Sequence, residues 1–156
     1  MTRVLGAVSL LVAALLYIRA RASYHQRSLG CYEVVLLHLS GLRRYISGSL
    51  GTIGEYLALR VEGGERLASA ITGGDRAGQE RFLSDLFLSD KARASLLDYF
   101  SLCGRGYLPD EIKLLDECIS AVDAEYRSEK EDGEKSLKVS SVFAVCLAVG
   151  AVILFL

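Results

Sequence analysis

The residues that could do chemistry include two histidines and four cysteines, spread along a chain of 156 residues. His25 and His38 lie on one predicted helix, and Cys31 stands seven residues before His38. A structural zinc site takes four nitrogen or sulfur ligands, commonly in closely spaced pairs. Because the sequence holds no CxxC pair, we expect no metal site and interpret these residues as packing or surface residues.

Two common catalytic motifs are not present in the sequence. Gly48, Gly51 and Gly54 recur at every third residue, but no Gly-Lys-Ser/Thr sequence follows them, as a phosphate-binding loop requires. The Gly-x-Ser-x-Gly sequence of serine hydrolases is also absent. We therefore expect no enzyme, with no catalytic residue and no cofactor.

Positive charge is concentrated in the first helical region and negative charge in the last. The first region is rich in arginine, whereas residues 110–134 are acidic overall. Pairing of these two helices within the chain and docking of a separate protein explain this asymmetry equally well, because exposed ion pairs add little stability and charge governs association. The candidate partner-binding residues are Arg43, Arg44, Asp110, Glu111, Asp116 and Glu117.

Helical periodicity organises the chain from Leu29 onward. Apolar residues recur three or four apart as far as Leu57, and Ser47-Gly48-Ser49 divides this stripe into two helices, the second reaching about Leu59. A shorter periodic piece, 67–71, follows between two Gly-Gly pairs.

The second half of the chain adds three predicted helices. The first is short and spans Phe82 to Phe87, and Ser89-Asp90 caps the next. Pro109, ahead of two acidic residues, opens a long helix that can continue to the C-terminus, with Gly133 as its weak point. No alternation typical of strands occurs, so the expected fold is all-α, an antiparallel bundle of about six helices.

Uncharged apolar runs stand near both ends. As helices, 4–18 would extend about 22 Å and 139–156 about 27 Å, close to the thickness of a bilayer's hydrocarbon core. We expect an N-terminal transmembrane helix at 1–20, a cytosolic bundle at 21–138 and a C-terminal transmembrane helix at 139–156. A cleaved signal peptide is the alternative for the first run, since Ala20-Arg21-Ala22 is similar to a cleavage site.

Positive residues beside the two runs predict the orientation. Arg19, Arg21 and Arg27 follow the first run and lysines precede the second, which places the middle domain in the cytoplasm and both termini outside the cell membrane. The odd number of cysteines outside the last run suits a reducing compartment. In that run a stripe of small residues predicts close helix packing, with the first span or with another copy: Ser140, Ala144 and Ala148, with Gly150 nearby.

With this layout, the sequence resembles the stage III sporulation protein AB family. The resemblance rests on Leu5-Gly6-Ala7 in the first run, on Leu39, Leu42 and Ile46, on residues 50–58, on Phe100 before a glycine turn and on the apolar tail with Gly150. It departs from the family pattern at Ser49, Arg43, Tyr45 and near Ile112. The resemblance implies a fold similar to the F domain of type II secretion and pilus platform proteins, a six-helix bundle.

The same resemblance implies a function. The chain would be a non-enzymatic membrane platform in the channel assembly between mother cell and forespore, with the cytosolic ATPase of that assembly, its other membrane subunits, the lipid bilayer and possible further copies of itself as partners, and no nucleic acid. An inner-membrane platform of a type II secretion or type IV pilus-like system outside sporulation is the alternative.

Overall fold

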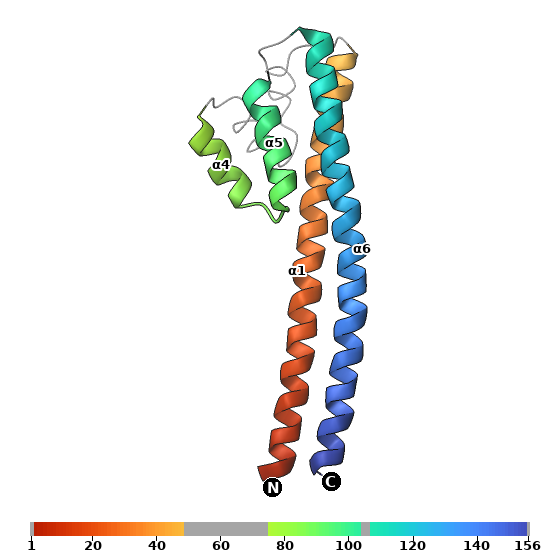
Figure 1. Cartoon of the computed structure of the whole chain (residues 1–156). Coiled ribbons are helices and arrows are strands. Elements are labelled where there is room, and N and C mark those ends of the chain that lie inside the picture. The colour runs from red at the N-terminus through yellow and green to blue at the C-terminus, as the bar shows by residue number, and fades with distance from the viewer. Residues whose placement is uncertain (1, 49–74, 104–106, 156) are drawn as a thin grey trace. The chain divides into compact units, whose positions relative to one another are not determined.

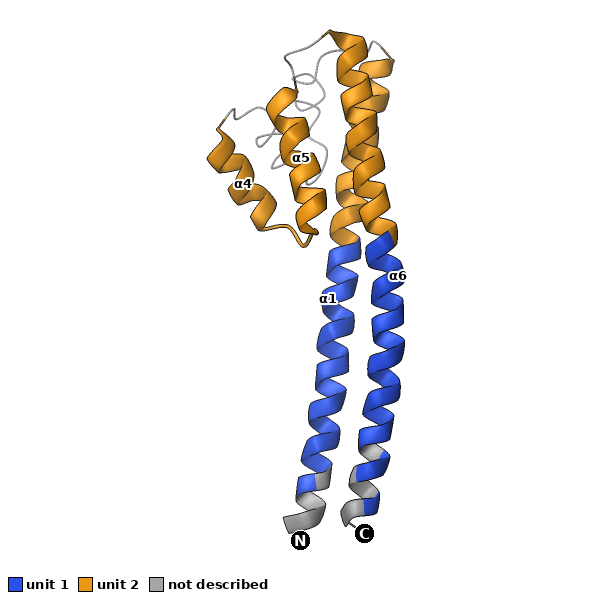
Figure 2. Ribbon diagram, in the orientation of Figure 1, with its two compact units in different colours: residues 1–29, 128–156 blue, residues 30–127 orange. Residues whose placement is uncertain are grey.

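The computed structural model describes residues 2–48, 75–103 and 107–155. This part of the chain contains helices α1 (Thr2–Ser47), α4 (Arg76–Ser84), α5 (Asp90–Leu102) and α6 (Leu108–Phe155), drawn in Figure 1. The chain divides into two compact units, coloured in Figure 2. We call residues 30–127 the middle unit and residues 1–29 with 128–156 the terminal unit.

Helices α1 and α6 each pass from one unit into the other without a break. The chain's one proline, Pro109, stands in the first turn of α6, where a missing amide hydrogen removes no helical bond. Gly133, expected as a weak point, lies inside the helix. The predicted continuation of the last helix to the C-terminus is therefore confirmed, as is the end of the first helix at Ser47.

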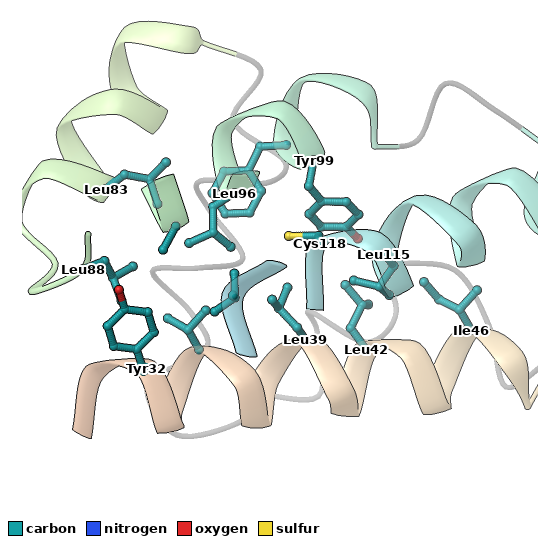
Figure 3. Close-up of a cluster of buried hydrophobic side chains, with 14 residues drawn as sticks. Tyr32, Leu39, Leu42, Ile46, Leu83, Leu88, Leu96, Tyr99, Leu115 and Cys118 are labelled. Atoms are coloured by element: carbon teal, nitrogen blue, oxygen red, sulfur yellow. The ribbon is translucent and has the colours of Figure 1, made fainter. Parts of the chain in front are cut away.

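The middle unit has a hydrophobic core contributed by all four helices (Figure 3). Its largest fully buried side chains are Tyr32, Leu39, Leu42, Leu96, Leu115 and Val122. On α1 and α6 the buried positions recur three or four residues apart, so each helix turns one stripe toward the core. This packing fixes the segment of α6 that carries most of the candidate site residues.

Capping residues set where the two short helices begin. Ser89 is the N-cap of α5, as predicted, and its Oγ accepts a hydrogen bond from the Ala92 amide at 3.2 Å. Asp75 caps α4 in the same way through the Ala77 amide. Asp75 starts this helix earlier than the apolar pattern suggests, and α4 ends at Ser84 with Asp85 as its C-cap, so the prediction of a helix from Phe82 to Phe87 is wrong at both ends.

Small and polar residues form the contacts within the terminal unit. The Arg21 guanidinium donates two hydrogen bonds to Ser136 Oγ, at 3.1 and 2.9 Å. The His25 ring lies so close to Gly133 that a Cβ at this position would overlap with the ring. Glycine is therefore required wherever this ring stays in place.

The expectation of about six bundle helices between two transmembrane helices is wrong for the described residues, which hold four helices. The segments expected as separate elements, 1–20 and the helix from Leu29, form one helix, and so do the last bundle helix and 139–156. No proline separates them, so each helix continues. The helices expected near 50–59 and 67–71 lie outside the described residues.

Within the described part of the chain, none of the helices has a stretch that is both long and apolar enough to cross a membrane. This contradicts the two expected spans and the localisation derived from them. A span takes about 20 apolar residues, whereas the first run reaches only from Val4 to Ile18, between Arg3 and Arg19. The described part of the second run, 139–155, is also shorter than this.

Candidate docking surface

The N-terminal third of α6 carries a hollow on its exposed side. Six residues line this hollow, which is shallow and largely open to solvent: Pro109, Ile112, Lys113, Asp116, Glu117 and Ser120. Their spacing of three and four residues places them on one face of the helix. The buried residues Leu115 and Cys118 lie between them in sequence, Val122 follows them, and all three turn toward the core. Packing of the buried face of α6 therefore holds the exposed face with these six residues in place.

Arg43 of α1 and Asp116 of α6 form an ion pair at the edge of this hollow. Arg43 Nε donates to Asp116 Oδ1 at 2.7 Å, and Nη2 donates to Oδ2 at 3.2 Å. This hydrogen-bonded guanidinium lowers the pKa of the Asp116 carboxyl below its ordinary value. The structure thus brings together two of the predicted site residues, by pairing within the chain.

The other predicted site residues are distributed around this pair. Glu117 lies on the next position of α6, where its Oε1 is 3.9 Å from Lys113 Nζ. Asp110 and Glu111 occupy the first turn of α6, where the helix dipole favours negative charge. Arg44 lies exposed in the last turn of α1. Acidic groups therefore dominate the N-terminal end of α6.

A second polar cluster joins three helices at the start of α5. Ser89 Oγ donates to Glu125 Oε2 at 2.8 Å, and the Ser89 amide donates to Tyr32 Oη at 2.9 Å. Lys91 Nζ lies 3.7 Å from Glu125 Oε1. Sequence reasoning identified Ser89 as a cap but missed Glu125 and Tyr32, because no local pattern reveals a partner on a distant helix. The cluster ties α5 to α1 and α6.

Neither histidine belongs to a metal centre in the described residues, where no group of three potential ligands gathers. His25 is buried, with its Nδ1 3.8 Å from Glu129 Oε1. His38 is buried on the α1 segment of the middle unit. Both histidines lie on helix faces that are covered by the rest of the chain.

The four cysteines are free thiols in different surroundings. Burial raises the pKa of Cys118 to about 12, and burial also raises the pKa values of Cys31 and Cys103. A thiol with a raised pKa holds little thiolate at neutral pH and is a poor nucleophile. Cys146 is exposed. These environments provide no activated thiol among the buried cysteines.

Three of the four small residues predicted to pack between helices have described side chains. Ser140, Ala144 and Gly150 are half-buried, and Ala148 lies outside the described side chains. Ser140 and Ala144 continue, at helical spacing, the stripe that begins with Gly133 and Ser136. Those last two residues face α1, and the packing of Ser140, Ala144 and Gly150 against a helix stays a prediction.

Comparison with known proteins adds no relative. The sequence matches no protein-family model, and searches of curated proteins and of solved structures give no match.

Proposed function

We propose that this chain is a non-enzymatic docking scaffold, and that the partner binds the hollowed face of α6 between Pro109 and Ser120. The observation that carries the proposal is an exposed, ordered helix face with an open, shallow hollow and charged residues around it. Following the resemblance to the stage III sporulation protein AB family, we propose the ATPase of that channel assembly as the partner.

Rigidity of the surface supports a docking role. Leu115 and Val122 are completely buried and Cys118 nearly so, which anchors the opposite face of the same turns of α6. The bidentate Arg43–Asp116 pair connects this face to α1. A surface that is already ordered loses little conformational entropy on binding, and this favours affinity.

The charge of the surface indicates what a partner should present. Asp116 is already paired with Arg43, whereas Glu117 pairs, among the described residues, only with a lysine of its own helix at 3.9 Å. Such an exposed pair within one helix contributes little and is readily exchanged. A lysine or arginine of the partner can therefore pair with Glu117 and with the acidic first turn of α6.

The test is binding of the full chain to the purified ATPase, measured by calorimetry, with Glu117→Lys as the disrupting variant. Glu131→Lys is the matched control, because Glu131 is also an exposed glutamate of α6 and pairs with a lysine four residues on, at 3.7 Å. We expect Glu117→Lys to weaken binding by about tenfold or more and Glu131→Lys to leave it unchanged.

Two outcomes would reject this proposal. Equal binding by both variants would exclude the α6 face as the docking site. No binding by the unaltered chain at micromolar concentrations would exclude the ATPase as its partner. Arg44→Glu is a second variant for the same binding test, because it reverses an exposed charge without breaking the Arg43–Asp116 pair.

A further inference from the structure

A buried histidine lies between α1 and α6 in the terminal unit, where it takes no part in the proposed docking. The His25 side chain is only 10% exposed. Its ring occupies the space that a Cβ at position 133 would fill. Gly133 is the one glycine between Glu129 and Lys138. The segment of α6 that packs here therefore makes room for the ring at one position.

One nitrogen of this ring lies near a carboxylate of α6. His25 Nδ1 is 3.8 Å from Glu129 Oε1, which is beyond hydrogen-bond distance. Among the described residues, Nδ1 is a buried atom without a hydrogen-bond partner, and such an atom costs free energy. A protonated imidazole donates from both of its nitrogens. Binding of a proton would therefore give Nδ1 a hydrogen to donate to Glu129.

Two charged groups approach the ring from the packed faces of the two helices. Glu129 of α6 is partly buried, with a side chain that is 36% exposed. Arg21 of α1 stands one turn before His25, and its guanidinium is bonded to Ser136 Oγ, about two turns of α6 beyond Glu129. Charges that are close and shielded from solvent interact most strongly, so Glu129 has the larger effect on the ring. The other charged residues nearby on the two helices are exposed: Arg27, Lys130, Glu131, Asp132, Glu134 and Lys135.

We propose that His25 and Glu129 form a proton-dependent ion pair that joins α1 to α6 when the imidazole binds a proton and weakens when the proton leaves. Histidine ordinarily changes its charge near pH 6.5 and glutamate near pH 4.3. Both charges are therefore present between about pH 4.3 and 6.5. The ion pair stabilises the contact between the helices in this range and loses its contribution as the pH rises further.

The terminal unit is sensitive to such a change because little else is buried in it. Among its described residues, no large apolar side chain is buried, whereas His25 is. A contact that depends on pH therefore makes up a large share of what holds these two helix segments together. This regulation acts on the terminal unit and does not depend on the proposed docking of an ATPase on the middle unit.

The first test is urea unfolding of the full chain and of Glu129→Gln at pH 5 and pH 8. Glutamine keeps the shape of glutamate and removes its charge. We expect this substitution to raise the unfolding equilibrium constant by about fivefold at pH 5 and by less than about twofold at pH 8, because only the protonated ring attracts the carboxylate. Glu131→Gln is the matched control, since Glu131 is exposed and pairs with Lys135 at 3.7 Å. Its effect should be equal at the two pH values.

The second test removes the titrating ring and follows the helix contact itself. In a His25→Gln background, Glu129→Gln should have the same effect at pH 5 as at pH 8. Hydrogen exchange, divided by the chemical exchange rate at each pH, should show that residues 19–29 open about fivefold less at pH 5 than at pH 8 in the unaltered chain. The opening of this segment in Glu129→Gln should be the same at both pH values.

Three results would overturn the inference. The first is an effect of Glu129→Gln on unfolding that does not change between pH 5 and pH 8. The second is a pH-dependent effect of Glu129→Gln that persists when His25 is replaced by glutamine. The third is opening of residues 19–29 in the unaltered chain that is the same at both pH values.

Discussion

The two units use the same two helices in opposite ways. In the middle unit, α1 buries Tyr32, Leu39 and Leu42 almost completely. In the terminal unit, Leu15 and Leu16 of the same helix are 65% and 62% exposed. The unit with α4 and α5 has enough helices to enclose large side chains, whereas the terminal unit has only two helix segments among the described residues. Apolar composition alone therefore does not indicate which residues form a core.

The contacts inside each unit differ in kind as well. Large aliphatic and aromatic side chains fill the middle unit, while the terminal unit is joined by the Arg21–Ser136 hydrogen bonds and by His25 against Gly133. Burial of large apolar groups provides most folding free energy. We therefore expect substitutions in the middle unit to affect stability most.

The largest effect should come from Leu96, which is completely buried on α5. Leu96→Ala should lower the free energy of unfolding by about 2–5 kcal/mol, because it removes buried methyl groups and leaves a cavity. Leu102→Ala is the control on the same helix, since Leu102 is half exposed, and it should change stability by about 0.5 kcal/mol or less. Urea unfolding followed by circular dichroism measures both. Equal losses would contradict the assigned core.

The next effect concerns Gly133 of the terminal unit. Gly133→Ala should destabilise the chain by about 1–3 kcal/mol, because the added Cβ requires the buried His25 ring to move. Gly30→Ala is the control: nothing lies near a Cβ at Gly30, so the better helix former should stabilise by about 0.5–1 kcal/mol. In a His25→Ala background, Gly133→Ala should also stabilise. Continued destabilisation in that background would contradict the His25–Gly133 contact.

A smaller effect is expected at the cap of α5. Ser89→Ala removes the acceptor of the Ala92 amide and the donor to Glu125, and it should cost about 1 kcal/mol of unfolding free energy. Ser101→Ala on the same helix removes only a bond to the carbonyl of Asp98 and should cost less. Chemical denaturation of the two variants compares them. A smaller loss for Ser89→Ala than for Ser101→Ala would argue against the cluster at the start of α5.

The smallest effect is the pH dependence of the Arg43–Asp116 pair. Because Arg43 lowers the pKa of Asp116 in the folded chain, the pair stabilises above the ordinary aspartate pKa of about 4 and loses this contribution as the pH falls further. The difference in stability between the unaltered chain and Arg43→Gln should therefore be constant near neutral pH and shrink below about pH 4. Arg44→Gln should show no such change. A difference that grows in acid would contradict the assigned pair.

Local signals in the sequence predicted several features of the fold. Ser89 predicted a helix start and Ser47 predicted a helix break, and both predictions depend only on neighbouring residues. Both positions mark helix ends in the structure. The single proline similarly indicated the start of the last helix, within one residue. The start of α4 was missed because Asp75 caps it before the apolar stripe begins.

Features that depend on distant partners were harder to predict. The charge asymmetry indicated that basic α1 and acidic α6 could pair, but only the fold selects Arg43 and Asp116 as the pair. The Ser89–Glu125 bond and the fit of His25 on Gly133 join residues more than 30 positions apart. The spans were predicted from hydropathy alone, and the described helices do not provide them.

Hydrogen–deuterium exchange of the full chain, with and without the ATPase proposed as its partner, tests the proposed docking surface most directly. We predict that added ATPase slows exchange in the α6 segment from Pro109 to Ser120 and leaves the segment from Glu129 to Lys138 unchanged. Slower exchange confined to segments other than Pro109 to Ser120, or no change anywhere in α6, would contradict the account.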